Sequence, residues 1–404
     1  MRSFISTLGI VSVVFLLSAC GPRTVEPVEP LERPRDVSDM GWHTYWQMPL
    51  NLAAGERVIS MHRIDDVLYC MTNNGALISM DPSVGIVHWR TSVGNRSDMP
   101  FTPIHANNVT MSRQVPGSVD LIENRLGLHQ YNVVMVNTRS RLFVIDRQSG
   151  VVLRDIRLGF SASTGGATNG ELFVVGSADA SFRAINIQNA VEQWSMWSKK
   201  SVISPLEYAR GMFFVAGRDG IFRGVLAQGR ESSITWTRDL GAPVSSPFAV
   251  DDRGVFVACD DGRLHMFNPA SGKPVWGYPY VMSGETNQGI LLSATSAFVR
   301  TKFSGLCAVN VANGQERWQL AEGTTVLAAG EGKVFVRNNR NQVLTVDEVL
   351  GKVLDHAMLG DLSVFVSQAT EQTIWACDSS NTVRCIRPVS SGQVSKQMLD
   401  AAVR

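Results

Sequence analysis

The side chains with the most chemical potential in this sequence are histidines, paired aspartates and cysteines. No two histidines stand at the spacing of a metal-binding helix motif, and the sequence contains no phosphate-binding loop, dinucleotide fingerprint or Gly-x-Ser-x-Gly elbow. Three aspartate pairs could carry acid–base chemistry or hold calcium, but each is expected at a tight turn: Asp65–Asp66, Asp251–Asp252 and Asp260–Asp261. We therefore expect no catalytic residue and no metal site.

Six cysteines divide into one near the N-terminus and five in the body of the chain, which are Cys70, Cys259, Cys307, Cys377 and Cys385. An odd number argues against a fully paired disulfide framework in an oxidising compartment. Cys377 and Cys385 flank one predicted hairpin and could pair across it. Buried free thiols in strands are the interpretation that we favour.

The remaining cysteine, Cys20, ends an export signal. Arg2 is the only charge before an apolar run that stops at Leu17, and the run is too short for a confident membrane span. The Leu17-Ser18-Ala19-Cys20 ending resembles a bacterial lipobox, which predicts a signal peptide at residues 1–19 and acylation of Cys20 with chains such as palmitate. An ordinary signal peptide that happens to contain a cysteine is the alternative. Gly21 after the cysteine favours an outer-membrane lipoprotein that faces the periplasm.

Residues 20–41 alternate prolines with charged side chains, a composition that cannot form a core and predicts an extended tether behind the lipid. The whole sequence of 404 residues is 44% hydrophobic and 18% charged, so a large core is available. It has 37 basic and 36 acidic side chains, and removal of Arg2 with the signal leaves a formal charge of zero. That balance argues against nucleic-acid binding.

A unit of about forty residues repeats over residues 42–400. Each copy has two β-rich runs, a turn that usually contains glycine and a further strand that often bears tryptophan, as in Val255–Trp276 and Ala297–Trp318. The turn residue locates eight copies: Gly85, Gly150, Ala190, Gly229, Gly272, Gly314, Gly351 and Gly392. Short strands with this period predict an all-β fold, an eight-bladed β-propeller of four-stranded antiparallel blades.

A tryptophan follows the turn residue in most copies and is expected to pack between blades rather than to bind a ligand. These structural tryptophans are Trp89, Trp194, Trp236, Trp276 and Trp318, while Arg154, Asp355 and Lys396 occupy the corresponding place in other copies. Either Tyr45–Leu50 or Gln393–Met398 could supply the outer strand of the last blade. We expect the N-terminal segment there, because leaving it unpaired would expose a hydrophobic edge.

The pattern Asp-x-x-x-Gly-x-x-x-Trp, seen at Asp81–Trp89 and, with Asn leading, at Asn310–Trp318, resembles the repeat of pyrroloquinoline-quinone-type (PQQ-type) β-propellers. The resemblance covers the chain from about Trp42 to Met398. It implies an enzyme alternative, since the family includes quinoprotein dehydrogenases that bind PQQ and calcium at the axis and often carry a disulfide between adjacent cysteines. This sequence has no adjacent cysteines. We therefore expect no cofactor and no enzymatic activity, and a quinoprotein-type propeller is the alternative.

Two places could bind a partner through loops displayed on a rigid ring. The first is an insertion at residues 95–130, whose apolar residues include Phe101 and Ile104; a blade strand with a decorated connection is the other interpretation. In the second, Trp197 adjoins Lys199 and Lys200, a composition typical of interfaces. Packing of Trp197 under the next loop is the alternative there.

The eight repeats, the lipobox and the chain length are together similar to the lipoprotein subunits of the outer-membrane β-barrel assembly machinery. This resemblance implies a non-catalytic scaffold, a monomer within a hetero-complex, that binds the central assembly subunit. Unfolded outer-membrane proteins are a further expected partner, and no nucleic acid is expected. A general envelope protein that binds glycans or peptides is a third hypothesis.

Overall fold

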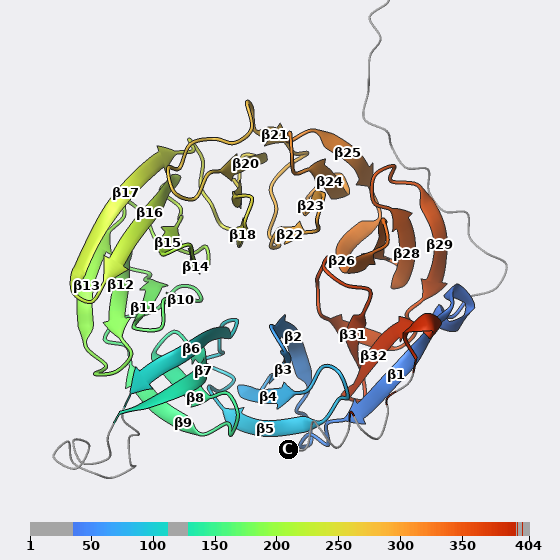
Figure 1. The fold of residues 1–404 in the computed structure, drawn as a ribbon, viewed down its shortest axis with the longest axis horizontal. Helices are drawn as coiled ribbons and strands as arrows, with labels where there is room; N and C mark the ends of the chain where they lie inside the picture. The colour runs from blue at the N-terminus through green and yellow to red at the C-terminus, as the bar shows by residue number, and fades with distance from the viewer. Residues whose placement is uncertain (1–34, 112–127, 393, 395–397, 399–404) are drawn as a thin grey trace, which may run out of the picture.

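Runs of β-branched and aromatic residues separated by Gly and Asx turns give a structure built almost entirely of short strands. The structure is a computed structural model that describes residues 35–111 and 128–392, together with residues 394 and 398. Its strands form eight four-stranded antiparallel sheets, which stand as blades around a central axis (Figure 1). The predicted eight-bladed all-β propeller is thereby confirmed. Within this part of the chain, no helix is long and apolar enough to cross a membrane.

The blades are numbered here in chain order, with the strands of each given from the axis to the rim. Blade 1 contains β2 (Val58–Ile64), β3 (Val67–Thr72), β4 (Ala76–Met80) and β5 (Val87–Ser92), and blade 2 contains β6 (Ile104–Met111), β7 (His129–Asn137), β8 (Arg141–Asp146) and β9 (Val152–Arg157). Blade 3 contains β10 (Ala167–Thr168), β11 (Leu172–Gly176), β12 (Ser181–Asn186) and β13 (Glu192–Trp197), and blade 4 contains β14 (Glu207–Ala209), β15 (Met212–Val215), β16 (Ile221–Gln228) and β17 (Glu231–Asp239). Blade 5 contains β18 (Ala249–Val250), β19 (Val255–Ala258), β20 (Arg263–Phe267) and β21 (Tyr280–Val281), and blade 6 contains β22 (Leu291–Leu292), β23 (Ser296–Thr301), β24 (Gly305–Asn310) and β25 (Glu316–Leu320). Blade 7 contains β26 (Gly323–Gly330), β27 (Lys333–Asn338), β28 (Gln342–Asp347) and β29 (Val353–Met358), and blade 8 contains β30 (Leu362–Phe365), β31 (Ile374–Asp378), β32 (Thr382–Pro388) and β1 (Trp42–Pro49).

The N-terminal strand closes the ring, as predicted. β1 pairs antiparallel with β32, from Trp42 opposite Pro388 to Pro49 opposite Thr382, and so becomes the rim strand of blade 8. Two short 3-10 helices flank this pair, η1 (Val37–Met40) and η3 (Val389–Ser391). The two ends of the propeller are therefore held together by main-chain hydrogen bonds within one sheet.

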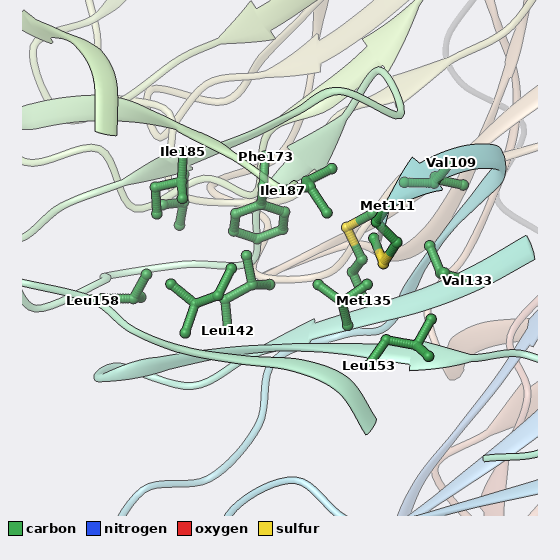
Figure 2. Close-up of a cluster of buried hydrophobic side chains, with 14 of the residues drawn as sticks. Val109, Met111, Val133, Met135, Leu142, Leu153, Leu158, Phe173, Ile185 and Ile187 are labelled. Atoms are coloured by element: carbon green, nitrogen blue, oxygen red, sulfur yellow. The ribbon is translucent and has the colours of Figure 1, made fainter. Parts of the chain in front are cut away.

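The core lies between neighbouring blades rather than at one centre. Each pair of adjacent sheets encloses a cluster of buried side chains, because successive residues of a strand point to opposite faces of its sheet. Figure 2 shows the cluster between blades 2 and 3, where Met135 and Leu142 of blade 2 face Phe173 and Ile185 of blade 3. Every blade thus depends on both of its neighbours for burial.

A recurring contact fixes each blade against the next, and we call it the tryptophan lock. An indole ring at the rim of one blade covers the turn glycine of the following blade, and its Nε1 donates a hydrogen bond of 2.8–3.0 Å to the carbonyl just after the Asp or Asn that opens that turn. The turn glycines have positive φ, and a Cβ on any of them would overlap the indole ring. The five locks are Trp46 on Gly85, Trp89 on Gly150, Trp236 on Gly272, Trp276 on Gly314 and Trp318 on Gly351.

The locks account for the departures from the sequence repeat at Arg154 and Lys396. Where the turn residue is Ala190, with a φ of 59°, the facing residue is Arg154, whose guanidinium lies 3.5 Å from the carbonyl oxygen of Gln188. An arginine can bend away from the extra methyl, whereas a fused indole ring cannot. Trp46 of β1 supplies the lock of blade 8 and so takes the place expected for Lys396, which lies outside the described residues.

The junction between blades 3 and 4 has no such lock. Leu226 occupies the position that Asn268 holds in the next blade, so the turn that would receive Trp194 is absent and β16 continues into a longer hairpin with β17. Trp194 is half-buried, and among the described residues none accepts a hydrogen bond from its Nε1. A groove of about 630 Å³ lies on this hairpin, lined in part by Tyr208 and Leu226.

Because indole rings cover the turn glycines, one methyl group has different effects in different turns. Gly272→Ala would place Cβ 2.5 Å from Cδ2 of Trp236, and we expect the free energy of unfolding to fall by about 2–4 kcal/mol. Ala190→Gly, in the turn that faces Arg154, should change it by less than about 1 kcal/mol. Denaturant unfolding of the purified variants measures both effects.

The matched control for this prediction is Gly241→Ala. Gly241 has a φ of 74°, but no atom lies within 4 Å of an added Cβ, so only backbone strain of about 1–2 kcal/mol is expected. An equal loss of stability in Gly241→Ala and Gly272→Ala would contradict the lock.

Candidate functional site

Trp197 is the most exposed tryptophan side chain on the ring, with 71% of its surface accessible. It is the last residue of β13, at the rim of blade 3, and exposed Lys199 and Lys200 follow it on the connection to blade 4. We call residues 197–201 the displayed loop. The sequence-predicted aromatic residue and its two cations therefore lie together on one accessible segment.

Hydrogen bonds hold the displayed loop on both neighbouring blades. The Ser198 amide donates to the carbonyl of Ala180 in blade 3 at 2.8 Å, and its hydroxyl donates to Oδ2 of Asp219 in blade 4 at 2.7 Å. The Arg218 amide donates to the carbonyl of Ser201 at 3.0 Å. A segment that is already ordered loses little conformational entropy when a partner binds it.

Asp219 joins the displayed loop to a buried ion pair. Its Oδ2 lies 2.5 Å from a guanidinium nitrogen of Arg223, and the two side chains are 0% and 8% exposed. Burial by itself raises the pKa of Asp219, but hydrogen bonds from Arg223, Ser198 and the Ile221 amide outweigh it and hold the pKa below its ordinary value. Asp219 is therefore ionised at neutral pH and accepts from the loop and from its own blade at once.

The other predicted partner-binding residues lie on a different connection. Phe101 is half-buried before blade 2, and its amide donates to the carbonyl of Asn137 at 2.8 Å. Ile104 begins β6, packs against the cluster between blades 2 and 3, and lines a cavity at the axis. Residues 112–127 of the insertion lie outside the described residues. The structure does not bring Phe101 and Ile104 together with Trp197.

A cavity of about 1000 Å³ lies within the ring, a size typical of small-molecule sites. The innermost strands of blades 1, 2, 4 and 8 line it. Arg63 on its wall pairs with Glu371 and lies 5.0 Å from the ring centroid of Trp375. Burial lowers the pKa of His62 to about 4, so this imidazole is neutral at physiological pH.

A hydrogen-bonded chain between blades 1 and 2 has the residue types of a general-base system. The Tyr69 hydroxyl lies 2.8 Å from Nε2 of His105, and Nδ1 of His105 lies 2.9 Å from Oδ2 of Asp65. Nδ1 also lies 3.0 Å from a guanidinium nitrogen of Arg147, so it donates to Asp65 when protonated and accepts from Arg147 when it is not. Tyr69 is 0% exposed, and burial raises its pKa. Because no substrate can reach this hydroxyl, the chain serves to join two blades.

The described part of the axial wall offers no calcium site. Within residues 35–111 and 128–392, no group of three or more His, Cys, Asp or Glu side chains could hold a metal ion, whereas calcium takes six to eight oxygen ligands. The described cysteines are free thiols. Cys377 and Cys385 are both buried, and desolvation raises the pKa of each to about 12, which makes them unreactive.

Two features escaped the sequence analysis. One is Glu207, which lines the axial cavity, whereas Ala249 occupies the same place in blade 5. The sequence signal that could have identified Glu207 is a charged residue two positions after Pro205, within a pattern that is otherwise shared with the next repeat. The other is exposed apolar surface on blades 5 and 6, where Tyr278 is 88% and Phe303 is 76% exposed. Tyr278 lies two positions after the lock residue Trp276, and Trp197 lies three positions after Trp194, so each exposed aromatic residue follows shortly after the tryptophan of its repeat.

An eight-bladed ring of four-stranded blades with Asx-x-x-x-Gly turns defines the molecule as a PQQ-type β-propeller. The comparisons agree with this class. A family model described as "Outer membrane protein assembly factor BamB" matches residues 225–394, from within blade 4 to the end of blade 8. The match confirms the repeat family that the sequence predicts.

The fold is similar to solved eight-bladed structures. The crystal structure of BamB from Moraxella catarrhalis matches with a TM-score of 0.60 at 14% identity, covering 86% of this chain and 97% of that one. The computationally designed Ika8 protein matches with a TM-score of 0.59 at 12% identity, covering 82% and 96%. No curated protein matches the chain in sequence. At these identities the structural matches establish the fold.

We expect the buried ion pair, and not its exposed counterpart, to hold the displayed loop. Asp219→Asn leaves Arg223 buried without a counter-charge and should lower the free energy of unfolding by about 3 kcal/mol at pH 7. In blade 3, Asp179 pairs with Arg183 at 2.6 Å but is 41% exposed, so Asp179→Asn should cost less than about 1 kcal/mol. Urea unfolding measures both, and comparable losses would contradict this role.

Acidification provides a second measurement on the same variant. Because the folded-state pKa of Asp219 is lowered from 3.8, its stabilising contribution is present above that value and is lost as the pH falls through the folded-state pKa. The stability difference between the native chain and Asp219→Asn should therefore shrink below about pH 4.

Proposed function

We propose that this protein is a non-catalytic, lipid-anchored scaffold of the outer membrane that faces the periplasm and assists assembly and insertion of β-barrel outer-membrane proteins, as part of a multi-subunit complex. The observation that carries this proposal is the match of the second half of the ring to the assembly-factor family model. The similarity in fold to BamB supports the same role.

The displayed loop is the surface that we assign to the partner. Its centre is a large aromatic side chain, 71% exposed, on a segment that Ser198 fixes to two blades. Tryptophan beside cations is typical of the few residues that dominate binding energy at protein interfaces. Lys199 and Lys200 would complement carboxylates around an apolar pocket on the partner, the central subunit of the assembly complex.

The anchor that we propose is a lipid on Cys20, which lies outside the described residues. The contacts of the first described residues support a proposal for where this tether meets the ring. Arg35 pairs with Asp355 of β29 at 2.8 Å, and its carbonyl accepts from the Met358 amide at 2.7 Å. η1 follows with a capping box and leads into β1. A lipidated tether would therefore join the propeller at its rim, between blades 7 and 8.

Replacing the central aromatic side chain tests the interface. Trp197→Ala should weaken binding of the full chain to the central assembly subunit by about thirtyfold or more, as expected for an interface residue worth about 2 kcal/mol. Co-purification from detergent-solubilised membranes, followed by surface plasmon resonance with the captured partner, measures the loss.

Tyr278→Ala is the matched control, because it removes an aromatic side chain that is 88% exposed on blade 5. It should bind the partner as the native chain does. Equal losses in both variants would place the interface elsewhere, and native chain that captures no β-barrel assembly subunit would refute the proposed function.

A further inference from the structure

Glu207 is a partly buried acid with no titratable residue on the strands packed against its own strand. It begins β14, the innermost strand of blade 4, and lines the axial cavity. The strands packed against β14 are β10, β15 and β18, and none of them contains a titratable residue. Among the residues that the structure describes, none donates a hydrogen bond to the Glu207 side chain or forms a salt bridge with it. Its charge is therefore uncompensated by the protein.

The other charges on the cavity wall have partners. Arg63 pairs with Glu371. Asp65 lies 2.9 Å from Nδ1 of His105 and 3.9 Å from a guanidinium nitrogen of Arg147. His62 is neutral because burial disfavours its charged form. Glu207 thus gives the wall of this cavity one unpaired negative charge.

The size and lining of the cavity indicate which class of ligand could neutralise this charge. A volume of about 1000 Å³ is far larger than a single ion requires, and the described residues offer no cluster of metal ligands. The wall does offer hydroxyl groups at Ser60, Ser363 and Thr370, and Tyr208 is an aromatic residue that also lines it. Hydroxyl oxygens accept from ammonium hydrogens, and aromatic faces attract organic cations.

We propose that the axial cavity binds a small organic cation of the alkylammonium class, with the Glu207 carboxylate as its counter-charge. This inference is independent of the scaffold role, because the cavity lies at the axis and the displayed loop lies at the rim. It assigns the propeller a ligand site of its own, in which blade 4 supplies the charge and blades 1 and 8 supply the hydrogen-bond acceptors.

Cation binding at this site is coupled to a proton. Burial raises the pKa of Glu207 to about 7, so the carboxyl is about half protonated at neutral pH and must ionise to pair with an ammonium group. Between pH 6 and pH 8 its ionised fraction rises about tenfold, and affinity for a permanently charged ligand should rise by the same factor.

The experiment is a ligand-observed NMR titration of the purified full chain with pentylammonium and with 1-pentanol, its neutral counterpart of similar size. We expect saturable binding of pentylammonium at pH 8, about tenfold weaker at pH 6. Glu207→Gln should weaken it at least tenfold and remove the pH dependence. Glu231→Gln is the matched control, because Glu231 lines the groove at the rim and not the axial cavity, and it should bind as the native chain does.

Several results would overturn the proposal. These are no binding to the native chain, equal binding of pentanol and pentylammonium, equal binding to Glu207→Gln, or saturable binding of calcium chloride that excludes the amine. The pH dependence of the native chain tests the proposal even without a variant. A thermal melt gives a second check: since the raised pKa means that ionisation of Glu207 opposes folding, Glu207→Gln should melt higher than the native chain at pH 8, with the difference shrinking as the pH falls through 7 and vanishing only below the unfolded-state value of 4.5.

Discussion

An indole ring lying over a glycine of positive φ is the contact on which this propeller depends. The ring of Trp236 leaves no room for a Cβ at Gly272. Its Nε1 donates a hydrogen bond to the carbonyl oxygen of Pro269, which would otherwise accept from water. The same geometry at five junctions sets the spacing between one blade and the next. It explains why a turn glycine and a tryptophan recur in most repeats, because each lock needs a tryptophan from one blade and a turn glycine from the next.

The displayed loop lies where this contact is missing. Trp194 belongs to the same strand as Trp197, yet it has no turn to cover, because Leu226 replaces the Asx residue of blade 4. Ser198, Asp219 and Arg223 hold the junction instead, through a buried ion pair and a hydroxyl bridge. The exchange of an apolar lock for a polar one coincides with the exposed Trp197 and the two lysines on the connection between blades 3 and 4.

The sequence was sufficient for the fold because the information that determines a propeller is local and repeated. Turn glycines, Asx residues and rim tryptophans predicted eight blades and the N-terminal closure strand, and the structure contains both. It also indicated Trp197 as an exposed aromatic side chain, since this additional tryptophan follows Trp194 by three positions and is followed by two lysines. It was not sufficient for Glu207 or for the Asp219 and Ser198 contact, because these depend on which residues of different blades meet across the axis or across a junction, and no local pattern encodes that. Nor could the sequence show that Ala190 and Arg154 compensate one another, since they lie in different blades.

Closure of the ring by β1 orders the events by which the propeller forms. Residue 42 pairs with residue 388, so the first strand of the domain to emerge during synthesis must wait until the last blade has been made before it finds its partner. Closing a chain over that separation has a large entropic cost that later contacts must repay, and β folds built on distant pairings form slowly. Until β32 arrives, β1 presents an unpaired apolar edge of the kind that invites association with other chains. A chain interrupted anywhere before blade 8 therefore leaves both an unpaired first strand and an uncovered interblade cluster, which makes the complete ring the smallest unit that protects itself from aggregation.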